Sequence, residues 1–255
     1  MYAEILLPQK VGKDKDTLTY QVPSQLEIKK GQIVHIPLRT KKIKGVVLNL
    51  HENTPPYKTK ELIEIVENAP HLESWQIDLL EWLAAYYFCP KFKVLKLFLP
   101  VSIVKKKKLT AFIPDDEDLF DLDKRHILNP EQLHALEKID QTTKQVIILK
   151  GITSSGKTEV YMHLADKHIH EGKQVLFLIP EISLTPQMAQ RFHGHFKHKL
   201  AIIHSQLTNK EKEKAWQSIH KGETKIVIGS RSSLFAPFKN LGAIIMDEEH
   251  DNSYK

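Results

Sequence analysis

Short apolar runs separated by turn residues make up the first fifty positions of the chain. The runs are AEILL, TLTYQV, QIVHIPL and KGVVLNL, with breaks at Lys30-Gly31 and Pro37. Short β-branched segments at this spacing are typical of a small β barrel or meander. The sequence therefore predicts a β-rich unit at the start of the chain.

A helical period follows the Pro55-Pro56 break. In SWQIDLLEWLAAYYF, residues 74–88, large apolar side chains recur at i, i+4, i+7, i+8 and i+11, and Ser74 is a candidate cap. The members of this stripe are Trp75, Leu79, Trp82, Leu83 and Tyr86. Such a stripe usually packs inward, so we expect it in the core, and stacking of its rings on bases is the weaker alternative.

From Asn129 onward, helical periods alternate with apolar runs that contain no polar alternation. The expected helices are NPEQLHALEKI, KTEVYMHLADKHIH, LTPQMAQRFHGHF and NKEKEKAWQSIHKG, and the expected strands are VIILKG, QVLFLIP, LAIIH, KIVIG and LGAIIMDEEH. Continuous apolar strands are expected where helices cover both faces of a parallel sheet. This part is predicted to be α/β and doubly wound, with the carboxyl ends of its strands along one edge.

Charge divides the chain into three parts. The net charge of +6 is distributed as +7 over residues 1–108, −5 over 109–131 and +4 over 132–255. Residues 104–125 pass from four lysines into a dense acidic run without an apolar period, which predicts a linker. We expect a β-rich domain over 1–104, a charged linker over 105–128 and an α/β lobe over 129–255. The lysine run either follows a phosphate backbone or is merely solvated.

Cysteine content and hydropathy narrow the class of protein. A single cysteine, Cys89, excludes an internal disulfide framework and a cysteine-rich zinc cluster within this chain. The start of the chain has no continuous apolar segment of the secretory type, and no run of about 18 apolar residues follows. These features predict a cytoplasmic protein without a membrane partner.

The stretch GITSSGKTEVY, residues 151–161, is the strongest chemical signal. It contains the complete pattern G-x-x-x-x-G-K-[ST], between a predicted strand and a predicted helix. Loop N–H groups and the positive helix end surround phosphates, Lys157 reaches the β and γ oxygens, and Thr158 takes a Mg²⁺ position. The candidate nucleotide-binding residues are Gln132, Gly151, Ser155, Gly156, Lys157, Thr158 and Glu159.

A second half of this site is predicted at the end of another strand. AIIMDEEH places Asp247 to hold Mg²⁺ and Glu248 to orient or deprotonate the attacking water. The alternative is a charged turn after a strand. Gln132 follows Asn129-Pro130 at a helix start, where its amide is placed to recognise an adenine edge. Two further loops after apolar strands, 180–187 and 229–235, carry small polar groups and one arginine.

Taken together, these strings resemble the primosomal replication-restart DNA helicases, the PriA family. The matching strings are GITSSGKTEVY, LIPEISLTPQM and IVIGSRSSLFAPFKNLGAIIMDEEHDNSYK, preceded by TLTYQVP, GQIVHIPLR, KGVV and LLEWLAAYYFCP. The resemblance implies a superfamily 2 motor that uses ATP and Mg²⁺ to move 3′ to 5′ on single-stranded DNA and restarts replication at abandoned forks. It implies a RecA-like P-loop lobe as the second domain.

Partners and DNA-contacting residues are also implied by the resemblance. The partners would be branched and single-stranded DNA with a 3′ end, primosome proteins and the single-stranded-DNA-binding protein, with the chain itself a monomer. The first domain would bind the nascent 3′ end. The DNA-contacting residues would be Tyr20, Pro180, Glu181, Ser183, Thr185, Arg231 and Ser232.

The chain departs from the family pattern at several places. Ser154 stands where the family loop usually has Gly, and Thr19 stands where an acidic residue is associated with 3′-end recognition. The segment before Asn129 is too short for a winged-helix domain. The chain stops at Lys255, so the expectation is a fragment without the second motor lobe, its arginine finger and a zinc-binding cysteine region, with little hydrolysis of its own.

Two other functions remain as alternatives. In one, the chain is a non-catalytic module that binds fork DNA and partners through residues 1–108. In the other, a small-molecule kinase uses the same loop, although a basic β-rich domain ahead of it disfavours this reading.

Overall fold

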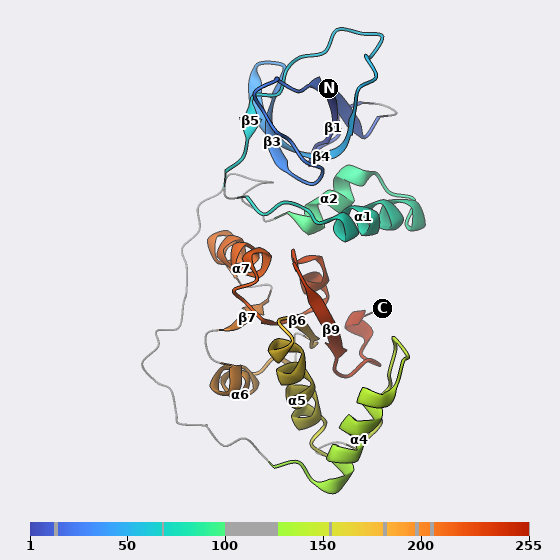
Figure 1. The fold of residues 1–255 in the computed structure, drawn as a ribbon, viewed down its shortest axis with the longest axis vertical. Coiled ribbons are helices and arrows are strands. Elements are labelled where there is room, and N and C mark those ends of the chain that lie inside the picture. Colours follow the sequence, from blue (N-terminus) through green and yellow to red (C-terminus); the bar gives the residue numbers. More distant parts are fainter. Residues whose placement is uncertain are drawn as a thin grey trace. The chain divides into compact units, whose positions relative to one another are not determined.

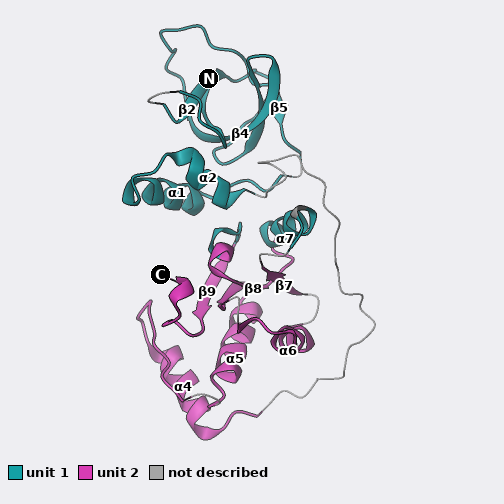
Figure 2. Cartoon of the chain, turned by 180° about the vertical axis from the view of Figure 1, so that it is seen from behind, with its two compact units in different colours: residues 1–112, 205–221, 234–239 teal, residues 113–204, 222–233, 240–255 magenta. Residues whose placement is uncertain are grey.

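A computed structural model describes residues 1–12, 15–67, 69–99, 127–152, 155–180, 183–196, 199–204 and 207–254. The chain forms two compact units (Figure 2). Unit 1 comprises residues 1–112, 205–221 and 234–239, and unit 2 comprises 113–204, 222–233 and 240–255. Most of the expected linker lies outside the described residues, so the expected domain boundaries stay a prediction. No helix among the described residues is both long and apolar enough to span a bilayer.

Unit 1 begins with a curled antiparallel sheet (Figure 1). Its strands are β1 Tyr2–Leu6, β2 Thr17–Gln21, β3 Ile33–Leu38, β4 Lys41–His51 and β5 Glu64–Ile65, in the order β2-β1-β4-β3-β5. A parallel bridge between Gln21 and Glu61 joins β2 to the segment ahead of β5. This bridge brings the two edges of the sheet together, which confirms the β-rich prediction and gives it a barrel-like closure.

The strands of this sheet bury both of their faces. Ile5 and Val47 belong to a core on one face, whereas the neighbouring Leu6 and Val46 belong to a core shared with two helices. Adjacent residues of a strand point to opposite faces, so one strand contributes to both cores. Gly45 of β4 faces β1 closely enough that an added Cβ would contact Ile5.

The two helices are α1 Ser74–Tyr86 and α2 Lys91–Phe98. The expected inward stripe of α1 is formed only in part: Leu79 and Leu83 pack against the core, whereas Trp82 and Tyr86 are more than half exposed. Their rings stack on each other in solvent, with centroids 4.8 Å apart. The buried face of α1 is instead formed by Gln76, Ile77, Leu80 and Ala84. Two apolar stripes share this helix, and packing against the sheet selected the one with smaller side chains.

The cap of α1 also differs from the expectation. Glu73, not Ser74, occupies the cap position, and the Glu73 N–H donates to Gln76 Oε1 over 3.0 Å. The buried Gln76 amide in turn donates to the carbonyl of Phe235, also over 3.0 Å. Helix α7, Asn209–Lys221, belongs to unit 1 as well, and its Trp216 indole donates to the Phe98 carbonyl over 3.4 Å. These polar contacts tie later parts of the chain to α1 and α2.

Unit 2 is a parallel sheet with helices. The strands are β6 Gln174–Leu178, β7 Leu200–Ile203, β8 Ile226–Gly229 and β9 Leu241–Met246, in the order β7-β8-β6-β9 with parallel pairing throughout. The α-helices are α4 Pro130–Gln141, α5 Lys157–His170 and α6 Pro186–Phe196, and the 3-10 turns η3 Arg231–Phe235 and η4 Asn252–Tyr254 follow β8 and β9. The predicted α/β class and the four strands after residue 170 are confirmed.

One predicted strand is not formed. VIILKG, residues 146–151, runs without secondary structure, and the Val146 and Ile148 side chains are 83% and 74% exposed. Among the described residues, no strand pairs with the outer edge of β9, where Ile244 is half exposed. An apolar β-branched run favours an extended backbone, but a strand exists only when its N–H and C=O groups pair with a neighbour. The strand prediction was wrong because the amino-acid composition of a run does not show whether a neighbouring strand is available to pair with it.

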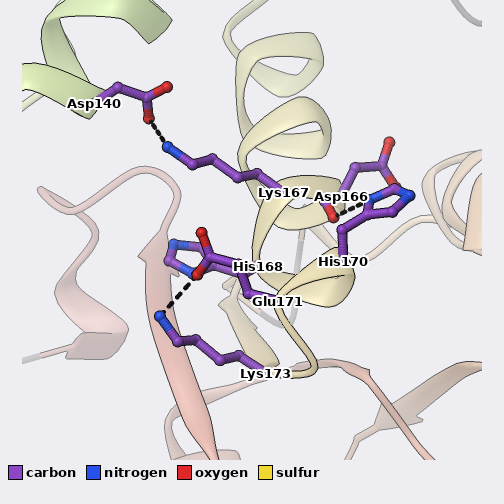
Figure 3. Close-up of polar contacts among 7 residues, drawn as sticks. All are labelled: Asp140, Asp166, Lys167, His168, His170, Glu171 and Lys173. Carbon is purple, nitrogen blue, oxygen red and sulfur yellow. Dashed lines mark hydrogen bonds and ion pairs between the residues drawn. The ribbon is translucent and has the colours of Figure 1, made fainter.

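Polar contacts hold the end of α5 in place (Figure 3). Lys167 pairs with Asp140 of α4 at 2.5 Å. His170 Nδ1 lies 2.7 Å from the Asp166 carbonyl, and Lys173 pairs with Glu171 at 2.7 Å. His168 lies beside Glu171, with its Nδ1 atom 3.7 Å from the carboxylate. Burial is the main cause that lowers the pKa of His168 below 6.5.

We expect His168 to destabilise unit 2 in mild acid. Because its pKa is lower in the folded state, the unfolded chain takes up the proton first, so stability is complete above about pH 7 and falls as the pH drops below 6.5. In thermal unfolding followed by circular dichroism, His168→Gln should reduce the loss of melting temperature between about pH 7 and 5. His170→Gln is the control, and an equal effect of both variants would contradict the assignment.

Candidate nucleotide and DNA site

Three strands of unit 2 end at the same edge of the sheet. Leu178 of β6 lies opposite Gly229 of β8 on one side and Met246 of β9 on the other. Half of the predicted site residues lie in three segments, 180–185, 230–232 and 247–248, which follow directly after these positions. Parallel pairing with this register places their starting points side by side, where ligands of open α/β sheets usually bind.

The phosphate loop leads into α5 through a left-handed glycine. Gly156 caps the helix with φ 79°, and Lys157 is the first helical residue, followed by Thr158. The Lys157 Nζ atom donates to the carbonyls of Gly151 and Ile152 over 2.9 and 3.0 Å. The ammonium group is therefore folded back over the loop, close to where phosphate oxygens would be held. Ser154 lies outside the described residues, so its effect on the loop stays a prediction.

Gln132 contacts this loop from α4. Its Nε2 group donates to the carbonyls of Ser155 and Gly156, over 3.2 and 3.4 Å. Its Oε1 atom accepts from the N–H of Asn129, which caps α4 with Pro130 at the first turn, as predicted. A Cβ at Gly156 would collide with the Gln132 amide. Position 156 therefore requires glycine both because the Gln132 side chain approaches the backbone closely and because φ is positive there. The side chain predicted to recognise adenine is thus hydrogen-bonded to the loop.

Asp247 and Glu248 follow β9. The Asp247 N–H donates to the Leu178 carbonyl over 3.0 Å, which extends the ladder between β6 and β9 by one residue. Burial raises the pKa of Asp247, and the hydrogen bond from the Glu248 N–H lowers it. Of the weaker effects, the Glu248 carboxylate raises this pKa and the Lys157 ammonium lowers it. Lys157 and Asp247 are therefore close enough to interact electrostatically. Glu248 adopts a left-handed backbone with φ 51°, which is uncommon for a residue with a side chain.

Glu159, one of the predicted nucleotide-binding residues, contacts a side chain of the protein. It lies in the first turn of α5, is largely buried, and forms an ion pair with Arg191 of α6. This pair joins two helices of unit 2. The carboxylate is thus engaged by a cation of the protein, and its assignment to nucleotide binding stays a prediction.

The predicted DNA-contacting residues have different environments. Pro180 is buried, Glu181 lies outside the described residues, and Thr185 precedes α6. Arg231 and Ser232 are exposed in η3 at the end of β8. The Ser183 hydroxyl donates to Glu248 Oε2 over 3.1 Å, so one of these residues contacts a predicted catalytic group. The motifs alone did not reveal this contact, because the two residues are 65 positions apart.

Tyr20 belongs to the core of unit 1. Its ring is 4% exposed, and its hydroxyl donates to the Pro37 carbonyl over 3.2 Å. The neighbouring Thr19 points the other way, and its hydroxyl lies 3.1 Å from that of Tyr57. Both Thr19 and Tyr57 line a cavity of about 650 Å³ in unit 1. Lys15, which also lines it, places its ammonium over the Tyr57 ring at 5.5 Å from the centroid.

Tyr57 is a candidate residue that the sequence analysis missed. It lies in a segment without regular structure, directly after Pro55-Pro56 and before Lys58. An aromatic residue between prolines and a lysine is a signal for an exposed ring, but it carries no helical or strand period. Tyr254 was also missed, because it too lies outside any helical or strand period. Its hydroxyl donates to the Asp247 carbonyl over 3.2 Å.

The fold and the site define a class: a P-loop nucleoside triphosphate-binding lobe preceded by a small β-rich domain. Two family profiles match these parts. The 3'DNA-binding domain (3'BD) of PriA matches residues 4–100, and the DEAD/DEAH box helicase domain matches residues 129–255.

Relatives match over nearly the whole chain. The replication restart protein PriA of Rickettsia conorii is 38% identical over 99% of this chain and 38% of its own length. That of Helicobacter pylori strain 26695 is 37% identical over 100% of this chain and 38% of its own length. The chain belongs to the PriA family of replication restart proteins. It spans little more than a third of the length of these relatives.

Proposed function

We propose that the chain is the part of an ATP-dependent replication-restart DNA helicase that binds the nucleotide and a DNA 3′ end. The observation that carries this proposal is that Lys157 and Asp247, which are far apart in the sequence, lie close enough for the Lys157 ammonium to lower the pKa of the Asp247 carboxyl. A phosphate loop and a metal-binding carboxylate are the two halves of a P-loop site. The family profiles support DNA as the macromolecular substrate.

The residues present fit Mg²⁺ and ATP. Left-handed Gly156 lets the backbone approach phosphates closely, Thr158 follows in the first turn of α5, and Asp247 offers a carboxylate. Lys157 would exchange its two carbonyl partners for phosphate oxygens. Bound Mg²⁺ and ATP would supply the phosphoanhydride bond and the charge neutralisation for its hydrolysis.

Glu248 is the proposed base or water-orienting group. Its hydrogen bond from Ser183 supports a link between the DNA-contacting segment and the chemistry, because movement of residues 183–185 on DNA would change the partners of this carboxylate. Arg231 and Ser232, one strand further along the same edge, are the proposed contacts to the DNA backbone. Pro180, Glu181 and Thr185 would shape the same surface.

We place the DNA 3′ end in the cavity of unit 1. Thr19 and Tyr57 offer hydroxyl groups, and the half-exposed Tyr57 ring offers a stacking face. Lys15, Lys30 and Lys91 line the cavity as cations, and Lys91 is paired with Glu81. Three carboxylates, from Glu4, Asp16 and Glu81, also line the cavity. Carboxylates disfavour a terminal phosphate and tolerate a terminal hydroxyl, so the lining suits a free 3′ hydroxyl.

The complete protein would move 3′ to 5′ on single-stranded DNA and restart replication with primosome proteins and single-stranded-DNA-binding protein. This chain by itself would hydrolyse ATP slowly. The alternative, a fork-binding module without catalysis, keeps the cavity of unit 1 but assigns no role to the electrostatic interaction between Lys157 and Asp247.

The 3′-end assignment predicts a preference between two forks. In fluorescence anisotropy at two salt concentrations, the chain should bind a fork with a free leading-strand 3′ hydroxyl more tightly than the same fork with a 3′ phosphate. Tyr57→Ala should weaken binding to the hydroxyl fork by roughly 5- to 150-fold, from the loss of one base stacking contact of about 1–3 kcal/mol.

Tyr86→Ala is the matched control, because Tyr86 is an exposed tyrosine of unit 1 that does not line the cavity. Equal binding to both forks, with a steep salt dependence and no effect of Tyr57→Ala, would contradict the pocket and leave only a basic surface that follows the backbone.

A further inference from the structure

Three side chains of unit 1 that have no part in the proposed nucleotide or DNA sites lie together. His71 and Glu73 are in the segment that enters α1, and His220 is in the last turn of α7. His71 Nε2 lies 3.2 Å from Glu73 Oε1, and His220 Nδ1 lies 3.8 Å from the same oxygen. One ligand atom from each residue lies within 4.8 Å of the other two. We propose that these three residues bind a divalent transition-metal ion, with Zn²⁺ as the preferred ion.

The donor set suits zinc. Two imidazole nitrogens and a carboxylate oxygen are common protein ligands of zinc, with bond lengths of about 2.0–2.2 Å. Tetrahedral ligands at these lengths are separated by about 3.3 Å. The distance from Glu73 to His71 already has this value, and the distance from Glu73 to His220 exceeds it by a fraction of an ångström. Small side-chain rotations would therefore complete the set without movement of the backbone.

The state of His220 is the second observation in favour of a metal. Its Nδ1 atom is buried and has no hydrogen-bond partner among the described residues. A buried polar atom without a partner is costly, and a metal ion would satisfy it.

The surroundings leave a position for a fourth ligand. His71 is 44% exposed at its side chain, so a water molecule can reach the ion. Three protein ligands and one water form a well-known zinc arrangement. The carboxyl end of α7 favours a cation nearby. The Lys239 ammonium disfavours a bound cation, because this positive charge is close enough to lower the pKa of His220. The bound ion would join the segment ahead of α1 to α7, two parts of unit 1 that are far apart in the sequence.

Titration of the chain with Co²⁺ and then Zn²⁺ tests this proposal. We expect one Co²⁺ per chain with the strong visible absorption of a tetrahedral site, displaced by Zn²⁺, which normally binds such sites more tightly. His71→Ala and His220→Ala should each weaken Zn²⁺ binding at least about 100-fold, since loss of an outer-shell partner alone often costs 10- to 100-fold. Zn²⁺ should also raise the melting temperature of the wild-type chain but not of His71→Ala.

Two matched variants separate this site from adventitious binding. His134 pairs with Glu137 on the surface of α4, so His134→Ala removes a histidine beside a carboxylate without touching the cluster and should leave Zn²⁺ binding unchanged. Lys239→Gln keeps all three ligands and removes a nearby positive charge, so it should bind Zn²⁺ at least as tightly as the wild type. If His220→Ala does not fold, Zn²⁺ binding by His71→Ala still tests the proposal, because His71 is more exposed. Unchanged binding in His71→Ala, or an octahedral Co²⁺ spectrum, would overturn the proposal.

Discussion

Lys157→Ala should abolish measurable binding of a fluorescent ATP analogue in the presence of Mg²⁺. Lys157 Nζ already holds two loop carbonyls at 2.9 and 3.0 Å, so its charge is placed at the phosphate position before any ligand arrives. A hydrogen bond to a charged group contributes about 1.5–3 kcal/mol, so losing one would weaken binding roughly 10- to 150-fold, and losing two would weaken it further. Equilibrium titration monitored by fluorescence measures this loss directly.

The matched control for this prediction is Lys167→Ala. Lys167 lies on the same helix and is an exposed partner of Asp140, so its loss removes a charge of equal sign at a surface ion pair worth at most about 1 kcal/mol. Fork binding by both variants should stay close to that of the wild type, because unit 1 carries the proposed 3′-end cavity. An equal loss of nucleotide and DNA binding in Lys157→Ala would contradict the assignment of nucleotide binding to unit 2 and of DNA 3′-end binding to unit 1.

Phe177→Ala should destabilise unit 2 by about 3–5 kcal/mol. Phe177 lies in β6, between β8 and β9, is 1% exposed, and meets the Phe192 ring edge to face at a centroid distance of 4.9 Å. Removing it leaves a cavity in the core of a domain whose total stability is typically only about 5–15 kcal/mol. Nucleotide binding should fall as well, because β6 supplies the carbonyl that holds Asp247.

The positions of the tryptophans allow the unfolding of unit 1 to be followed separately from that of unit 2. All three, Trp75, Trp82 and Trp216, lie in unit 1. In urea unfolding, the transition seen by circular dichroism should move in Phe177→Ala, while the fluorescence transition, which reports unit 1, should move little. Phe88→Ala is the control, because Phe88 is 97% exposed and surface changes usually stay within about 0.5 kcal/mol. A shift of the fluorescence transition alone would contradict the assignment of Phe177 to unit 2.

Local patterns in the sequence predicted much of this fold correctly. Helix α5 has the predicted limits, the Asn129-Pro130 start of α4 is confirmed, and β6 to β9 lie within the predicted runs. These features depend on capping, on hydrophobic period and on apolar run length, all of which act within a few neighbouring residues. The phosphate loop was recognisable for the same reason, since its chemistry needs residues that are contiguous in the chain.

The errors fall where the outcome depends on distant partners. The exposed faces of Trp82 and Tyr86 were mistaken for core, and residues 146–151 were mistaken for a strand. An amphipathic helix with two apolar stripes does not specify which one meets the sheet, and an apolar run does not specify which strand accepts its hydrogen bonds.

The sequence by itself determined the element types, the phosphate loop and the carboxylates at the end of β9. Only the tertiary structure decided which side chains meet: Ser183 with Glu248, Thr19 with Tyr57, and Glu73 with the histidines at 71 and 220. Each of these contacts joins residues that are distant in the chain or lie in segments without a regular period. Their proximity follows from sheet order, strand register and helix packing, which are properties of the assembled units and not of any local stretch of residues.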